Sequence, residues 1–140
     1  MDKTELVIEL IQAGEKLIIA LDKTNFKVTA AMWFYLSETN EWRLIIASPY
    51  VDSNGPKKSY EFIQEQLASL SPGSEMSNDV ATDIVRYLSL ENISVISPKD
   101  KLIKLMRPAL GTTSGIFHIR FTKNAINNVL IEDAYIYRMT

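Results

Sequence analysis

The sequence predicts an α+β fold in which an antiparallel sheet of about five strands is covered by about four helices. Two apolar runs joined by a short polar turn predict a central hairpin, and an alternating run near the C-terminus predicts a second one. Elsewhere, apolar residues recur at helical spacing. At 140 residues the chain fits one domain, 1–140, that is long enough to bury its own core. The expected order of elements is α-ββ-α-α-β-α-ββ.

The first helix is expected from Thr4 to Leu21. Apolar residues recur there at helical spacing and form one stripe: Leu6, Val7, Leu10, Ile11, Leu17, Ile18 and Leu21. Ile8 and Ile19 lie off that stripe and widen the apolar face. This helix is therefore expected either to lie deep in the core or to contact something besides its own sheet.

The central hairpin is expected to pair a strand over 28–36 with a strand over 42–47 across the turn 37–40. Aromatic residues occur on both faces of the first strand, so neither face suits water. The backbone groups of such buried runs need partners, and the nearest lie across the turn. The hairpin is the predicted centre of the sheet. If the chain's own helices leave one face open, Trp33 and Tyr35 mark a docking surface.

Three further helices and one short strand are expected next, with bounds set by caps and prolines. They are a helix over 56–70 after a turn at 52–55, a helix from Ser77 or Asn78 to Leu88, a strand over 93–96, and a helix capped by Ser97. The last helix should break at Arg107, because the residue before Pro108 is pushed out of helical geometry.

The second hairpin is expected after a flexible joint over 111–115. The run 116–123 alternates strictly: Phe117, Ile119 and Phe121 lie on one side, and His118, Arg120 and Thr122 lie on the other. One face of this strand is therefore expected to be buried and the other half wet. The segment 123–128 turns the chain, and 129–139 reads as the last strand.

Composition excludes several classes of site. The chain has no cysteine and one histidine, His118, which rules out disulfides, thiolate metal sites and a multi-histidine metal site within one chain. A formal charge of -2 and a pI near 5.4 disfavour nucleic acid as a partner. The acidic start is wrong for a signal peptide, and no apolar run approaches the roughly 20 residues that span a bilayer. A cytoplasmic protein without a membrane partner is expected.

Catalytic signatures are weak. The glycines are scattered, no serine sits in a glycine-flanked elbow, and His118 reads as an incidental strand histidine. A metal-dependent phosphodiesterase or nuclease would need converging carboxylates, for which the candidates are Glu41, Asp52 and either Glu132 or Asp133. The turn-forming residues around Asp52 explain it better as a turn residue. No catalytic residue, metal or cofactor is predicted.

The residues that favour an interaction surface are aromatic and basic. Tyr135 and Tyr137 share a face of the last strand, near which His118 and Arg120 are expected. Such a surface could stack single-stranded bases or contact protein, since tyrosine and arginine are enriched in interface hot spots. With Trp33 and Tyr35 from the first hairpin, these four complete the set of candidate interaction residues.

The sequence therefore favours a small protein that works by binding, as a non-catalytic interaction or regulatory module, over an enzyme. Self-association as a homodimer is expected from the excess of apolar surface, and an unidentified protein partner is a second expectation. The phosphodiesterase and the single-stranded nucleic-acid-binding sheet stay as alternatives.

Overall fold

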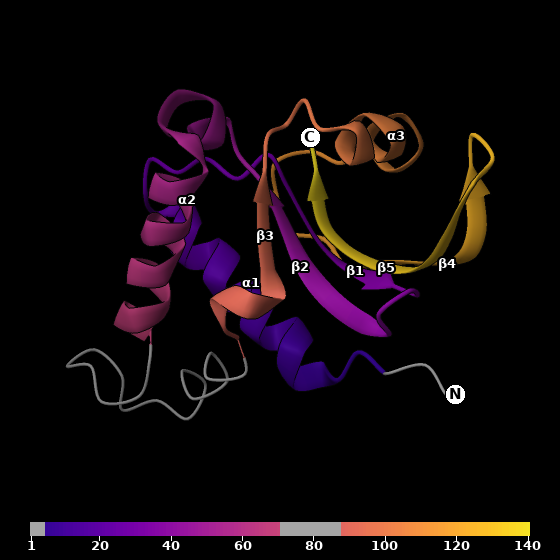
Figure 1. The fold of residues 1–140 in the computed structure, drawn as a ribbon, viewed down its shortest axis with the longest axis horizontal. Coiled ribbons are helices and arrows are strands. Elements are labelled where there is room, and N and C mark those ends of the chain that lie inside the picture. The colour runs from indigo at the N-terminus through magenta and orange to yellow at the C-terminus, as the bar shows by residue number, and fades with distance from the viewer. Residues whose placement is uncertain (1–4, 71–87) are drawn as a thin grey trace.

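The computed structural model describes residues 5–70 and 88–140, and it has the predicted α+β class. Three α-helices, one 3-10 helix and five strands lie in these ranges (Figure 1). In chain order they are α1 (Ile8–Asp22), β1 (Ala30–Leu36), β2 (Glu41–Ala47), α2 (Pro49–Leu70), η2 (Leu90–Asn92), β3 (Ile93–Ile96), α3 (Lys101–Leu110), β4 (Ile119–Ile126) and β5 (Val129–Met139).

The five strands form one sheet in the order β3-β2-β1-β5-β4. The hairpins β1–β2 and β4–β5 are antiparallel, as is the β1–β5 pair that joins them. β3, however, runs parallel to β2, so the sheet is mixed and the predicted all-antiparallel sheet was wrong. A parallel pair needs a long crossover connection, and the segment that carries α2 supplies it.

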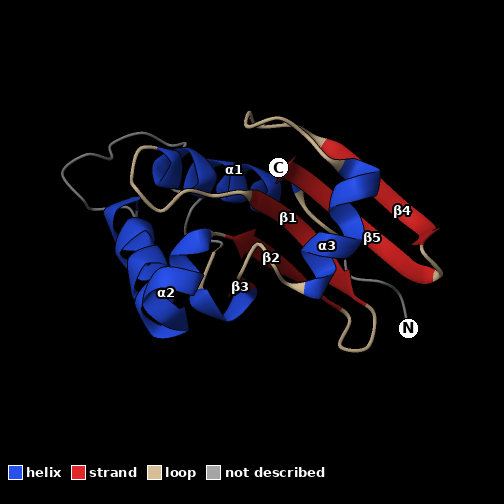
Figure 2. Ribbon diagram, turned by 90° about the horizontal axis from the view of Figure 1, so that it is seen from above, coloured by secondary structure: helices blue, strands red, loops and turns tan. Residues whose placement is uncertain are grey.

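Helices of the same chain cover both faces of the central hairpin (Figures 1 and 2). Trp33 and Leu44 pack with Leu17 of α1 and Ile63 of α2 in one core cluster. On the opposite face, the second cluster joins the hairpin to α3 through residues that include Met32, Ile45, Ile103 and Met106. Figure 1 shows β4 and β5 curling toward the α3 side. The hairpin is therefore core on both faces.

α1 starts later than predicted. The predicted first residue, Thr4, lies outside the described residues, and the helix begins at Ile8. Val7 occupies the N-cap position and makes no side-chain capping bond. Residues that cap well are serine, threonine, aspartate and asparagine, and none of them occurs among residues 5–7.

α2 starts earlier than predicted, at Pro49 instead of Pro56. The hydroxyl of Ser48 accepts a hydrogen bond from the amide of Tyr50 at 3.1 Å, so a Ser-Pro pair opens the helix. The predicted turn at 52–55 thus falls where the first helical segment ends at a kink, and the predicted helix over 56–70 matches the segment after it. Gly55 has φ 84°, ψ 167° and kinks the helix, and Pro56 restarts the helical path after the kink.

α3 differs from its prediction at both ends. Its cap is Asp100, whose carboxylate accepts from the amide of Leu102 at 3.0 Å, whereas the predicted cap Ser97 lies outside the helix. The helix passes through Pro108 to Leu110 and does not break at Arg107. Near a helix end the proline removes only one hydrogen bond, and the Arg107 guanidinium fixes this turn by donating to the carbonyl oxygens of Thr140 (2.9 Å) and Pro98 (3.1 Å).

The second hairpin is shifted along the chain. β4 spans Ile119–Ile126 where 116–123 was predicted, and β5 matches its prediction. The turn is the pair Asn127 and Asn128, with φ of 49° and 67°, which is the positive-φ geometry of a two-residue hairpin turn. The predicted turn over 123–128 was therefore too long.

The joint predicted over 111–115 is anchored to the last strand at Thr112. Its amide donates to the Met139 carbonyl at 2.8 Å, and its hydroxyl accepts from the Met139 amide at 2.9 Å. β3 matches the predicted strand over 93–96. The helix predicted from Ser77 or Asn78 lies outside the described residues, apart from Leu88.

Candidate interaction surface

Two of the predicted interaction residues, Trp33 and Tyr137, lie in the core against α1. Trp33 is 1% exposed and Tyr137 is 0% exposed. The Trp33 indole Nε1 donates to the Tyr137 hydroxyl (3.0 Å) and to the Leu10 carbonyl (3.2 Å), and the Tyr137 hydroxyl donates to the Ile11 carbonyl (2.5 Å). These bonds tie α1 to the sheet. Both side chains therefore lie beneath the surface.

A β-bulge explains why Arg138 reaches α1 together with its neighbour Tyr137. Pairing of β1 with β5 shifts between Ala31, opposite Arg138, and Met32, opposite Ile136. The extra residue is Tyr137, and both it and Arg138 reach α1: Arg138 forms a bidentate pair with Asp22 at 2.9 and 2.8 Å. Two neighbouring residues of β5 thus hold both ends of α1.

Tyr35 is also largely buried, at 6% exposure. Its ring packs on Trp42 with centroids 5.3 Å apart, and its hydroxyl donates to the side-chain oxygen of Asn40 in the β1–β2 turn. Tyr35 therefore braces the turn of the hairpin.

The other three predicted residues lie together on the surface beside α1. His118 Nδ1 is 2.6 Å from the Tyr135 hydroxyl, and Nε2 is 3.4 Å from a carboxylate oxygen of Glu15 on α1. Because Nε2 faces the carboxylate, we place the imidazole proton there, which leaves Nδ1 to accept from the hydroxyl. The contact joins the segment before β4 to the middle of α1.

Arg120 lies next to this group on the same face. Its Nε and Nη2 donate to the two carboxylate oxygens of Asp133, both at 2.7 Å, and its guanidinium carbon lies 5.6 Å from the Trp42 ring centroid. The Asp133 side chain is 1% exposed and that of Arg120 is 45% exposed. The hydrogen bond to Asp133 raises the pKa of Arg120, so this group stays cationic.

The electrostatics of this surface hold the Tyr135 hydroxyl in its protonated form. Burial, with the charge of Glu15 as a smaller cause, raises the pKa of the Tyr135 hydroxyl and keeps it protonated. Nucleophilic or basic tyrosine chemistry needs the opposite shift. The His118 side chain is 55% exposed, so water has free access to it. We call the group Glu15, His118, Arg120, Asp133 and Tyr135 the strand–helix surface.

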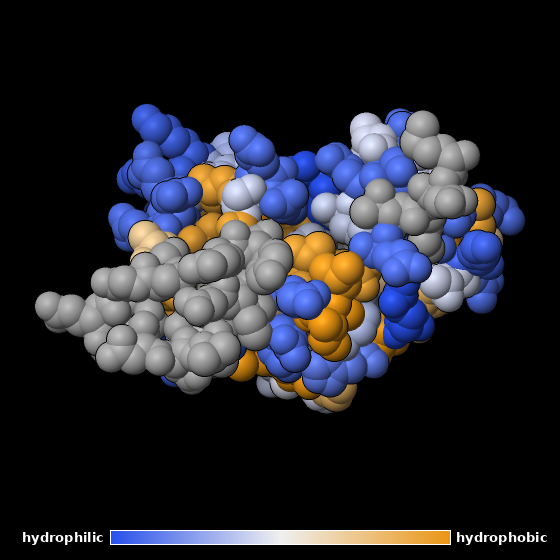
Figure 3. Space-filling model, turned by 90° about the horizontal axis from the view of Figure 1, so that it is seen from below, coloured by the Kyte–Doolittle hydropathy of each residue, from blue (hydrophilic) through white to orange (hydrophobic). Residues whose placement is uncertain are grey.

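A second exposed feature is the outer stripe of α1, which we define as Ile8, Gln12, Glu15 and Ile19. Ile8 is 59% exposed and Ile19 is 42% exposed, and the Val7 side chain beside them is also exposed. α1 lies on the lower side of the molecule in Figure 1, and the view of that side in Figure 3 shows an apolar patch near its middle. Ile8 and Ile19, which the sequence placed off the buried stripe, are therefore exposed, and so is Val7, which it placed on that stripe because the helix was expected to begin before it.

The carboxylates of the phosphodiesterase alternative do not converge. Glu41 begins β2, whereas Asp52 lies in α2, beyond the other end of that strand, and Asp133 is engaged by Arg120. Within residues 5–70 and 88–140, no group of three or more histidine, aspartate or glutamate side chains is placed to hold a metal ion. None of the helices in these ranges combines the length and apolarity needed to cross a bilayer.

Comparison with known proteins adds no family to this description. No protein-family model, curated protein or solved structure matches the chain significantly.

Sequence reasoning missed two members of the strand–helix surface, Glu15 and Asp133, and also Trp42, on whose ring Arg120 packs. Glu15 has no pattern that points to His118, because the two meet only when α1 docks on the sheet. Asp133 and Trp42 were hidden by the unknown hairpin register. The sequence did contain one signal for that register. Asn127 and Asn128 mark a two-residue hairpin turn, since asparagine tolerates positive φ.

Proposed function

We propose that this protein is a non-catalytic interaction module that acts as a homodimer, and that two copies pair through the outer stripe of α1. The observation that carries the proposal is the exposure of Ile8 and Ile19, which are 59% and 42% exposed on a helix whose opposite side is buried from Ala13 onward. Large apolar side chains gathered on one exposed face are typical of sites for protein contact.

The spacing of the stripe supports pairing with a second copy. Positions 8, 12, 15 and 19 repeat at intervals of four, three and four residues, which is the seam spacing of two packed helices. In an antiparallel pair about a two-fold axis, Ile8 of one copy faces Ile19 of the other. The same axis sets Gln12 opposite Glu15, where the amide can donate to the carboxylate. The stripe is thus self-complementary, as an isologous interface requires.

The strand–helix surface extends this interface. Glu15 belongs to both features, and its contact with His118 brings Tyr135 to the flank of the stripe. A stable interface buries about 800 Å² per partner, which is roughly a tenth of the 7929 Å² surface of this chain. One helix stripe supplies only part of that area. We therefore expect His118 and Tyr135 to contact the second copy at the rim.

Sedimentation velocity from about 1 to 100 μM tests the proposal, because a micromolar dimer dissociates over this range. The Ile8→Glu, Ile19→Glu double variant should be a monomer throughout, since it sets carboxylates against each other across the axis. The matched control is Val129→Glu, which removes an exposed apolar residue far from α1 and should leave the dimer intact. A wild-type protein that stays monomeric at every concentration would refute the proposal.

A further inference from the structure

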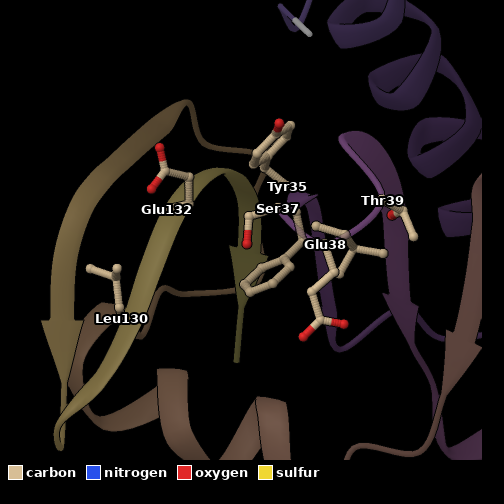
Figure 4. Close-up of a pocket in the computed structure, with 8 residues that line it drawn as sticks. Tyr35, Ser37, Glu38, Thr39, Leu130 and Glu132 are labelled. Carbon is tan, nitrogen blue, oxygen red and sulfur yellow. The ribbon is translucent and has the colours of Figure 1, made fainter. Parts of the chain in front are cut away.

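A hollow of about 300 Å³ opens between the β1–β2 turn and β5. It is lined from the hairpin by residues 34–39 and from β5 by Leu130 and Glu132. Figure 4 shows Leu130 and Glu132 on one side of it and the turn residues Ser37 and Glu38 on the other. The volume lies at the small end of the range for ligand sites, about 300–1,000 Å³.

The hollow forms where β1 and β5 diverge. Their pairing ends at Phe34 and Ala134. Beyond that rung, β1 continues with β2 to the turn, and β5 continues with β4 into the curled hairpin (Figure 1). The hollow occupies the fork between the diverging strands, so the backbone of two hairpins fixes its shape.

The lining combines an apolar floor with unneutralised acid. Leu130 is 65% exposed, the most exposed large apolar side chain in the described ranges, and Phe34 and Leu36 are partly buried beside it. Of the eight lining residues only Glu38 and Glu132 carry charge, and both are acidic.

Neither of these two carboxylates has its charge neutralised by a cation in residues 5–70 or 88–140. No ion pair there involves Glu38 or Glu132. The nearest cation by register is Lys123, between the rungs Thr122–Asp133 and Asn124–Ile131. Its φ of 44° departs from strand geometry, and it forms no ion pair with Glu132. The hollow is therefore a site of uncompensated negative charge over exposed apolar surface.

We propose that this hollow binds an arginine side chain from a basic, extended segment of a partner protein. The three methylenes of arginine would lie along Leu130 and Phe34. Its planar guanidinium would bring five donors into a hollow whose only charges are the carboxylates of Glu38 and Glu132, with the hydroxyls of Ser37 and Thr39 as further acceptors. Lysine, a strongly hydrated point charge with three donors, suits an acidic hollow with an apolar lining less well, so arginine is preferred.

The probe is acetyl-arginine amide, titrated into ¹⁵N-labelled protein and followed by amide chemical shifts. Shifts should be confined to residues 34–39 and 129–133. Acetyl-lysine amide should bind more weakly, and acetyl-norleucine amide, which keeps the apolar stem without the charge, should bind at least about tenfold more weakly. N-propylguanidine carries the same guanidinium and three-carbon stem without a peptide backbone. Binding as tight as that of acetyl-arginine amide would assign the site to small guanidines and overturn the peptide assignment.

The variants Glu38→Gln and Glu132→Gln test the acid directly. Each should weaken the binding of acetyl-arginine amide about tenfold, because each removes one of the two negative charges that attract the guanidinium. The matched control, Glu65→Gln, removes an exposed glutamate on α2 and should change nothing. Equal losses in all three variants, or shifts spread over every acidic residue, would show nonspecific charge attraction and overturn the proposal. The lining of the hollow shares no residue with the α1 stripe, so binding of the probe is measured separately from dimer formation.

Discussion

Replacing Gly14 with alanine tests how α1 is fixed to the sheet. Gly14 is a buried residue in the middle of α1, and alanine normally stabilises a helix interior by about 1 kcal/mol relative to glycine. Here a Cβ would lie 2.5 Å from the Tyr137 hydroxyl and 2.9 Å from Trp33 Nε1. Both groups are held by hydrogen bonds to each other and to α1 carbonyls, so neither can move aside freely. The usual sign of the substitution should therefore reverse.

The size of the effect follows from these contacts. Overpacking costs about 1–3 kcal/mol, and pushing the Tyr137 hydroxyl off its acceptor costs about 1–3 kcal/mol more. After subtracting the gain in helix propensity, we expect Gly14→Ala to lower the free energy of unfolding by about 3 kcal/mol. For a chain of this size that corresponds to a fall in Tm of about 10 °C. Urea unfolding followed by circular dichroism measures it.

Two companion variants separate this reasoning from a general intolerance of mutation. Gly115→Ala sets a Cβ 3.5 Å from the Phe117 ring, an ordinary contact, and should change stability by less than about 0.5 kcal/mol. In a Tyr137→Phe background the closest clash is gone, so the cost of Gly14→Ala should shrink by at least about 1 kcal/mol. A stabilising Gly14→Ala, or an equal cost in both backgrounds, would refute the packing argument.

Three further predictions concern single contacts. Burial raises the pKa of the Tyr137 hydroxyl, so the folded chain keeps a proton that the unfolded chain loses near pH 10. The contribution of this group to the free energy of unfolding should be constant below that pH and decrease above it, so alkaline destabilisation should be less steep in Tyr137→Phe. Arg120→Met deprives the buried Asp133 of its guanidinium and should cost about 2–3 kcal/mol in urea unfolding, below the usual range for a broken buried pair because Arg120 is half exposed; no loss would contradict the assignment. Asp100→Ala should cost about 1 kcal/mol in thermal unfolding by removing the α3 cap, and Ser97→Ala distinctly less; the reverse order would restore the predicted cap.

The periodic segments were predictable from sequence because burial imposes their pattern. The strand over 93–96, the last strand and the buried stripe of α1 all follow from apolar spacing alone. Element ends were less predictable. Ser48-Pro49 and Ser97-Pro98 look alike, yet only the first opens a helix, since Asp100 offers a better cap downstream of the second.

Long-range geometry decided what sequence patterns could not. Aromatic density at Trp33 and Tyr137 predicts exposure or burial equally well, and only the docking of α1 resolves it. The parallel pairing of β3 depends on the path between β2 and β3, which carries no local signature. The hollow depends on where β1 and β5 diverge, so neither Glu38 nor Leu130 could be identified beforehand.

Cysteine cross-linking tests the proposed dimer most directly, because the natural chain has no cysteine and any introduced thiol is unique. In the antiparallel pair, position 8 faces position 19 of the other copy, and the two copies of position 8 are about 17 Å apart along the axis. A mixture of Ile8→Cys and Ile19→Cys proteins should therefore form a mixed disulfide on mild oxidation, and Ile8→Cys alone should not. The control is a mixture of Ile8→Cys with Gln64→Cys, a position on the exposed side of α2. Pairing through α1 would be contradicted if the mixture with Ile19→Cys forms no more mixed disulfide than this control.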